Sequence, residues 1–185
     1  INPAVWTDQG NNVNWIVVNA APLANAGQDQ SAYVGNMVTL NGSGSSDPEG
    51  NPLTYSWTFS SRPDNSTAVL TNATSASPTF TPDKLGTYIV GLTVNDGALN
   101  SLADTVTITV LNSAPVANAG VDQSVYVGNT VTLNGGNSSD VDDDTLTYSW
   151  TISSKPESSA ATLTNATSVS PTFTADKFGT YVVSL

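Results

Sequence analysis

The sequence predicts an all-β protein made of two-sheet β-sandwiches in tandem, and three observations support this prediction. Apolar and polar residues alternate with a period of two along short runs. Turn signals such as Asn-Gly, Asp-Pro and Asp-Gly interrupt these runs roughly every 8–12 residues. The same succession of runs and turns occurs twice, at an offset of 93 residues.

The first copy contains about seven strand-like runs. They cover residues 31–35, 37–42, 53–59, 68–72, 78–82, 86–96 and 104–110. The third run shows the alternation most clearly, because Leu53, Tyr55, Trp57 and Phe59 share one face while threonine and serine share the other. No segment has a helical period. About seven short strands in roughly 90 residues are typical of a β-sandwich.

The second copy stops before the first one does. Residues 21–92 and 114–185 are identical at 50 of 72 positions without a gap. The first copy then continues from Thr93 to Val110, whereas the second ends at Leu185, the counterpart of Leu92. We therefore expect the second sandwich to lack its last strand.

The N-terminal segment has the pattern of that last strand. Residues 12–22 are in register with residues 105–115, and Val13, Trp15 and Val17 occupy the apolar positions. We interpret residues 1–19 as the end of a preceding module, residues 20–112 as domain 1 and residues 113–185 as a truncated domain 2. An exposed sandwich edge accepts extra strands, so we expect residues 12–18 to exchange between molecules by docking on domain 2.

Composition excludes several classes of function. The net charge of −11 argues against phosphate-mediated nucleic-acid binding and against anionic membranes. The chain has no Cys and no His, which excludes disulfides, ordinary zinc sites, cysteine nucleophiles and a Ser-His-Asp triad. No apolar run approaches the roughly 20 residues of a membrane-spanning helix.

The motifs resemble a known extracellular family. The text "APVANAG" followed by "DQSVYVG" and "LTYSW", with a later "DK.GTY", is similar to the PKD (polycystic kidney disease) domain. The resemblance covers both copies and implies immunoglobulin-like sandwiches, which this family carries in tandem in secreted enzymes and surface proteins. Many members have "WDFGDG" after the aromatic strand, whereas this chain has "WTFSSRPDNS" and "WTISSKPESS". That longer insert resembles the variant in REJ-like modules and large extracellular arrays.

An acidic turn precedes the aromatic strand in each copy. Asp47, Glu49 and Asn51 in the first copy correspond to aspartates in the second, but an EF-hand is excluded because the later glycine and glutamate positions do not match. The simplest interpretation is a turn capped by aspartate side chains. The PKD resemblance implies an alternative, which is a Ca²⁺ ion between the entering linker and two acidic turns. The residues implied are Asn19, Asp47 and Asp96 in the first copy, and Asn112 and Asp140 in the second.

Other side chains invite functional interpretations. The acidic turn does not suit glycoside hydrolysis, which needs two carboxylates across a cleft. Trp57 and Trp150 could stack on sugars, but their position in the alternation favours the core. The tyrosine pairs Tyr33/Tyr126 and Tyr88/Tyr181 are interpreted as structural, and the cations Arg62 and Lys155 as solvated. Trp6 has no matching aromatic residue in either copy and is the candidate ligand contact.

The function predicted from the sequence is that of a non-catalytic, extracellular module of a secreted or cell-surface protein. Such a module would act as a spacer and bind polysaccharide or protein. The alternative is a structural stalk, stiffened by calcium and without a ligand. An enzyme fragment is disfavoured by the missing His, Cys and paired carboxylates.

Overall fold

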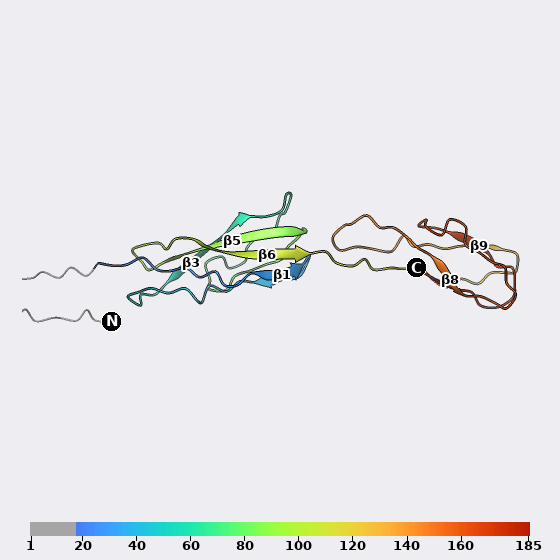
Figure 1. Cartoon of the computed structure of the whole chain (residues 1–185), viewed down its shortest axis with the longest axis horizontal. Coiled ribbons are helices and arrows are strands. Elements are labelled where there is room, and N and C mark those ends of the chain that lie inside the picture. The colour runs from blue at the N-terminus through green and yellow to red at the C-terminus, as the bar shows by residue number, and fades with distance from the viewer. Residues whose placement is uncertain (1–17) are drawn as a thin grey trace, which may run out of the picture. The chain divides into compact units, whose positions relative to one another are not determined.

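The computed structural model describes residues 18–185 and divides the chain into two compact units, residues 1–112 and 113–185. Every regular element in the described part is a β-strand (Figure 1). This confirms the predicted all-β sandwich class. Trp6 and most of the segment 12–18 lie outside the described residues, so the assignment of residues 1–19 to a preceding module stays a prediction. No helix in residues 18–185 could cross a bilayer.

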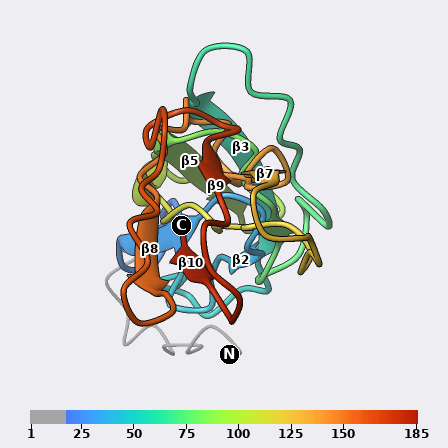
Figure 2. The ribbon, with the colours of Figure 1, turned by 90° about the vertical axis from the view of Figure 1, so that its right-hand side faces the viewer.

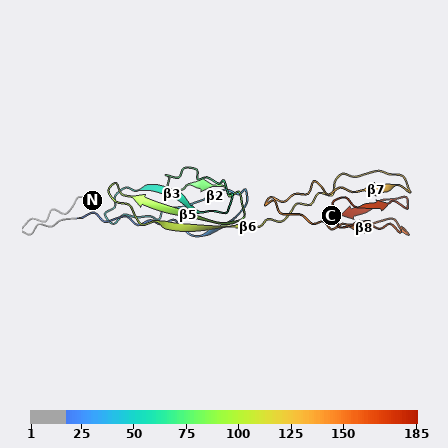
Figure 3. The same ribbon diagram turned by 90° about the horizontal axis from the view of Figure 1, so that it is seen from above.

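The described part of unit 1, residues 18–112, contains six strands in two sheets. They are β1 (Gln30–Tyr33), β2 (Val38–Thr39), β3 (Thr54–Ser61), β4 (Thr79–Phe80), β5 (Gly86–Asn95) and β6 (Asp104–Leu111). The larger sheet has the order β1-β6-β5-β3 (Figure 1), and the smaller one pairs β2 with β4. Figure 3 shows β3, β5 and β6 along the length of the unit. Within the larger sheet β6 is parallel to β1 and antiparallel to β5. The last strand therefore joins the first strand to the rest of the sheet.

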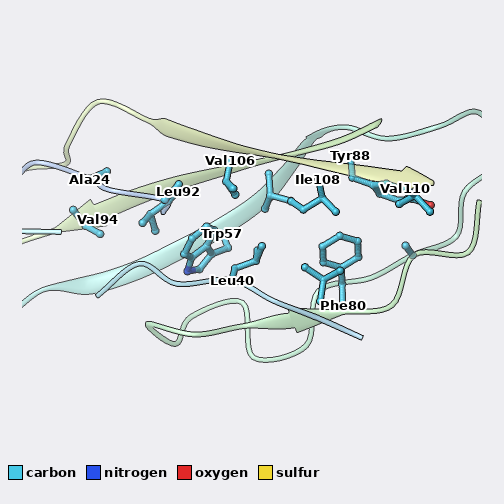
Figure 4. Close-up of a cluster of buried hydrophobic side chains, with 14 residues drawn as sticks. Ala24, Leu40, Trp57, Phe80, Tyr88, Leu92, Val94, Val106, Ile108 and Val110 are labelled. Carbon is cyan, nitrogen blue, oxygen red and sulfur yellow. The ribbon is translucent and has the colours of Figure 1, made fainter. Parts of the chain in front are cut away.

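The core of unit 1 lies between the two sheets, as the alternation predicts (Figure 4). Trp57 is only 3% exposed, and Leu53, Tyr55 and Phe59 on the same face pack against the core. β6 contributes Val106, Ile108 and Val110, which are 0–4% exposed.

The predicted strand at residues 68–72 forms only an isolated bridge between Thr71 and Thr79. Asn72 has a φ of 57°, and the Ser75 amide donates to the Asn72 carbonyl across a turn. The chain is turned toward β3 instead, where the Ala73 carbonyl accepts from the Trp57 amide. A left-handed residue ends the extended conformation, which asparagine tolerates better than most side chains.

Unit 2 contains four short strands. They are β7 (Thr130–Thr132), β8 (Thr151–Ser154), β9 (Thr172–Thr174) and β10 (Val182–Ser184). β8 pairs with β10, and β7 pairs with β9 (Figure 2). Its core contains Val131, Leu133, Trp150, Ala161, Phe173 and Ala175. Residues 123–126, which correspond to β1, are not a strand.

Candidate functional site

The acidic turn of unit 1 is organised by Asp47. Its Oδ1 atom accepts hydrogen bonds from the backbone amides of Glu49 and Asn51, at 3.0 and 2.9 Å. The Gly50 amide also donates to the Asp47 carbonyl. This is the aspartate-capped turn that the sequence predicts as the simplest interpretation.

The entering linker is attached to that turn and to the β5–β6 loop. The Asn19 side-chain amide donates to Asp96 Oδ2 at 2.6 Å, and the Asn51 side chain donates to Asn19 Oδ1 at 3.2 Å. The Ala20 amide donates to Glu49 Oε2 at 3.2 Å. The structure thus brings Asn19 and Asp96 into contact and places both beside the turn that Asp47 caps.

Hydrogen bonds also lower the pKa of Asp96 below its usual value. The donors are the Leu99 amide, the Asn19 side chain and the Ala98 amide, in decreasing order of effect. The carboxylate is therefore held in its charged form, which is the form that binds a cation.

One oxygen of the turn fits a cation. Asp47 Oδ2 is buried and has no hydrogen-bond partner. A buried carboxylate oxygen is normally bonded, and an orphan of this kind indicates an ion or a water molecule. The side chains of Asn19, Asp96 and Asn51, which are hydrogen-bonded to one another beside this turn, also carry hard oxygens of the kind that bind Ca²⁺. Residues 18–185 contain no group of three or more Asp, Glu, His or Cys that could hold a metal, so amide oxygens would have to complete such a site.

Unit 2 repeats the turn. Asp140 Oδ1 accepts from the Asp142 amide at 2.8 Å, and Asp142 Oδ2 accepts from the Ser113 amide at 2.6 Å. Asp140 Oδ2 and Asp142 Oδ1 are buried without a partner. Asn112 is the last residue of unit 1, at the position equivalent to Asn19. The orphaned oxygen of Asp47 therefore recurs at Asp140 in the second copy.

A second carboxylate cluster lies elsewhere in unit 1. Asp83 accepts hydrogen bonds from the Ser66 hydroxyl, the Thr67 amide and hydroxyl, and the Tyr88 hydroxyl, at 2.5–3.0 Å. Desolvation tends to raise the pKa of Asp83, but these hydrogen bonds outweigh it and hold the pKa far below 3.8. Tyr88 is fully buried, so the cluster joins a loop to the core and is structural.

Unit 2 has the same cluster around Asp176. The Ser159 hydroxyl, the Ala160 amide and the Tyr181 hydroxyl donate to the carboxylate at 2.5–2.9 Å. The hydrogen bond from Ser159 has the largest effect, and together the donors lower the pKa of Asp176 to about 2. Sequence reasoning missed this role of Asp83 and Asp176. The available signal is an aspartate five residues before Tyr88 in the first copy and before Tyr181 in the second.

The two cations predicted to be solvated are exposed, and each also donates a hydrogen bond to a loop carbonyl. Arg62 donates to the Ala68 carbonyl and lies over the Phe59 ring at 5.7 Å. Lys155 donates to the Ala161 carbonyl at 2.8 Å. A cation at this position thus donates to a loop carbonyl in each unit.

The aromatic candidates divide between core and surface. Trp57 and Trp150 are 3% exposed, and their indole nitrogens donate to the Ser75 and Ser168 carbonyls, which confirms their structural role. Tyr126 is 86% exposed and does not have the structural burial expected of it. The Trp6 prediction falls outside the described residues.

Comparisons with known proteins match this architecture. A family model described as "K319L-like, PKD domain" matches residues 26–110 and 119–185. The chain is 31% identical over 173 residues to the dyslexia-associated protein KIAA0319-like protein of Mus musculus, with 91% of this chain and 16% of that protein covered. It is also 31% identical over 142 residues to chitinase A of Pseudoalteromonas piscicida, with 74% and 16% covered. The chain thus spans about a sixth of the length of each relative.

A solved structure is also similar to part of the chain. It is the solution structure of the PKD domain from the KIAA 1837 protein, with 31% sequence identity and a TM-score of 0.41. The match covers 51% of this chain and 90% of that domain.

Proposed function

Because the chain belongs to the family of K319L-like PKD domains, we propose that it is a non-catalytic extracellular module that spaces other domains of a secreted or cell-surface protein. In this role the two sandwiches carry neighbouring domains and contact polysaccharide or protein.

The attachment of the entering linker carries this proposal. Each unit holds the chain that enters it by a backbone amide bonded to an acidic turn, at Ala20 in unit 1 and at Ser113 in unit 2. A spacer needs each module to restrict the segment before it, because a free linker would let attached domains reorient. The same contact recurs in both copies, which supports its role in restricting the movement of the entering linker.

Polysaccharide is the first ligand class to test, since one relative with 31% identity is named chitinase A. The purified chain is mixed with chitin, cellulose, alginate gel and collagen fibres, and the retained fraction is measured after washing. We expect retention on at least one polysaccharide, and Trp6→Ala is expected to reduce it if Trp6 is the contact. Failure to be retained on any of the four materials would remove the adhesion role and leave that of a spacer.

A calcium-stiffened stalk is the second candidate, and the buried, unpartnered oxygens of Asp47 and Asp140 favour it. When bound, Ca²⁺ would supply positive charge to these oxygens and would tie the linker residue Asn19 to the two loops that flank it. The residues that would hold it in unit 1 are Asn19, Asp47 and Asp96. In unit 2 we expect Asp140 to take part, with Asn112 at the equivalent linker position.

Thermal unfolding tests the stalk. A ligand at 100 times its dissociation constant stabilises the folded state by about 2.7 kcal/mol, so millimolar Ca²⁺ should raise Tm by several degrees. Asp47→Asn should reduce the rise in Tm that Ca²⁺ causes in unit 1. Asp64→Asn, on an exposed turn, should leave that rise unchanged. Equal Tm values in Ca²⁺ and in chelator would exclude the ion.

A further inference from the structure

Unit 2 has an open groove on the sheet formed by β7 and β9, and threonine side chains surround it. The groove has a volume of about 380 Å³ and also extends over the segment 160–164, which is bridged to β9 (Figure 2). Five of the residues that line it are threonines, namely Thr130, Thr162, Thr164, Thr172 and Thr174. We call this feature the threonine groove. A spacer does not require it.

The strand alternation turns these threonines toward solvent. Val131 on β7 and Phe173 on β9 belong to the core of unit 2, and Leu163 packs against that core. Each of the three is the middle residue of a Thr-x-Thr triplet. Successive side chains of an extended chain point to opposite faces, so the threonines on both sides of each core residue point outward.

The threonine hydroxyls have no partner in the protein. Within residues 18–185, none of the five hydroxyls in the groove donates or accepts a hydrogen bond. The backbones of Thr164 and Thr172 are bonded to each other at 2.8 and 3.2 Å, which holds the segment 160–164 beside β9. The position of the hydroxyls is therefore set by the sheet, while their hydrogen-bonding capacity is left for a ligand.

Unit 1 has a different surface at the same place. Six of the nine residues that line the groove are identical in the two copies. Thr130 and Thr162, however, stand at the positions of Met37 and Val69, which are 70% and 71% exposed in unit 1. Unit 2 thus presents hydroxyls where unit 1 presents apolar side chains.

The third difference between the copies frees a carboxylate oxygen. In unit 1, Asp83 Oδ2 accepts hydrogen bonds from both the amide and the hydroxyl of Thr67, at 2.6 and 2.7 Å. In unit 2, Ala160 stands at the position of Thr67, and within the described residues Asp176 Oδ2 accepts only from the Ala160 amide, at 2.7 Å. Asp176 lines the groove, so one acceptor position on this oxygen is available there.

This set of groups suits a neutral ligand that carries many hydroxyls. A threonine hydroxyl can both donate and accept a hydrogen bond, whereas a carboxylate only accepts. A sugar hydroxyl complements both kinds of group. Among the described residues no cation lines the groove, and the net charge of the chain is −11, so an anionic ligand is disfavoured.

We propose that the threonine groove of unit 2 binds a neutral polysaccharide, whose hydroxyls bond to the threonine hydroxyls and to Asp176 Oδ2. The inference rests on the adhesion role proposed above, and it gives that role a site and a ligand class. The groove volume lies at the lower end of the range of about 300–1,000 Å³ for small-molecule sites, so it holds a short stretch of the chain. Because the groove is open to the surface, the polysaccharide can continue beyond it.

Binding of the 185-residue chain to insoluble polysaccharides tests the groove. We expect retention on chitin or cellulose, which are neutral, and weaker retention on alginate, which is anionic. Thr130→Met combined with Thr162→Val gives the groove the side chains that unit 1 carries. We expect it to weaken binding about tenfold, or about 1.4 kcal/mol, which two lost hydrogen bonds can supply. Thr151→Val, an exposed threonine on β8 in the other sheet, is the matched control and should bind as the native chain does.

The outcomes separate this inference from the adhesion role. Retention on chitin or cellulose that the double variant does not weaken would overturn the groove as the site and leave the adhesion role in place. Retention on alginate alone would overturn the ligand class. A native chain that no polysaccharide retains would overturn both the inference and the adhesion role.

Further substitutions test the carboxylate and the transfer of the site. Ala160→Thr introduces the hydroxyl that bonds the equivalent aspartate in unit 1, so it should weaken binding without lowering Tm. In the chain with the double variant, Met37→Thr, Val69→Thr and Thr67→Ala together should restore retention by giving unit 1 the groove of unit 2. Unchanged binding by Ala160→Thr, or no restoration by the three substitutions, would contradict the proposal.

Discussion

Gly42 and Gly135 leave room for a tryptophan ring in the core of their units. A Cβ atom at Gly42 would lie 2.9 Å from Cζ2 of Trp57 and 2.9 Å from Cδ2 of Leu92. The corresponding distance from Gly135 to Cζ2 of Trp150 is 3.0 Å. Real Cβ atoms are essentially never found as close as 2.9 Å, so a methyl group at Gly42 would displace its neighbours, and at Gly135 the fit is tight.

Gly42→Ala should therefore destabilise unit 1. Overpacking of a core costs about 1–3 kcal/mol, and urea denaturation followed by circular dichroism measures it. Trp57→Phe removes the atom that the methyl group would meet, so the same substitution should cost less in that background. An equal cost in both backgrounds would show that the glycine serves the turn and not the packing.

The clusters of Asp83 and Asp176 predict a loss of stability in acid. Both pKa values are lower in the folded protein than the usual 3.8, and that of Asp176 is about 2. Carboxylates with a lowered folded pKa stabilise the fold above the unfolded pKa, and this stabilisation is lost as the pH falls through the folded pKa. Tm should therefore fall between pH 4 and pH 2, if about 3.8 is taken for the unfolded aspartate.

Substitutions separate this effect from general acid unfolding. Asp83→Asn keeps the size of the side chain but removes the charge, so it should lower Tm at pH 7 and flatten the decline in acid. Asp64→Asn, on an exposed turn, is the matched control and should change neither. A pH profile of Asp83→Asn that coincides with that of the native chain would contradict the role given to the cluster.

For individual residues, the sequence predicts which side chains are buried better than it predicts which residues contact each other. The alternation around Trp57 places the indole inward, because period-two burial is a local property of a strand. The partners of Asp83 come from positions 5 to 17 residues away and require the fold before they can be identified. The link between Asn19 and Asp96 spans 77 residues, and only a family resemblance brought the two residues together.

Among the elements, β6 has the largest effect on its neighbours. Its three inward side chains are 0–4% exposed, and it joins β1 to β5. The counterpart of β1 in unit 2 has lost its strand conformation, although three of its four residues are identical to those of β1. Strand formation at these residues therefore depends on the pairing partner more than on local propensity.

Ile108→Ala tests the contribution of β6 to unit 1. Removal of a fully buried isoleucine side chain costs about 2–5 kcal/mol, and denaturant unfolding should show this loss. Thr109→Ala changes the next residue of the same strand, whose side chain is exposed, and should cost much less. Similar losses for the two variants would mean that the inward face of β6 is not the stabilising one.

For the elements, the sequence predicts strand positions well where strands are long. β3, β5 and β6 fall within two residues of the predicted runs 53–59, 86–96 and 104–110. The short run 68–72 fails, because its turn at Asn72 follows from contacts with β3 that the sequence does not reveal. Short apolar runs with few ladder bonds are decided by tertiary neighbours.

For the whole molecule, the two units should differ in stability although their sequences are similar. Unit 1 encloses Tyr88, Val90 and Leu92 completely, whereas the corresponding Tyr181, Val183 and Leu185 of unit 2 are only partly buried. Burial of apolar area stabilises a fold by about 25 cal/mol per Å², and the area that stays in solvent makes no such contribution. Unit 2 should therefore open at a lower temperature and a lower free energy than unit 1.

Hydrogen exchange measured by mass spectrometry makes this difference visible, because the chain contains its own internal standard. Peptides covering residues 86–92 and 179–185 have similar sequences but different pairing, since β5 is bonded to two strands and β10 to one. At low protein concentration the second peptide should exchange much faster than the first. Equal protection of the two peptides would mean that pairing to one strand protects β10 as well as pairing to two strands protects β5.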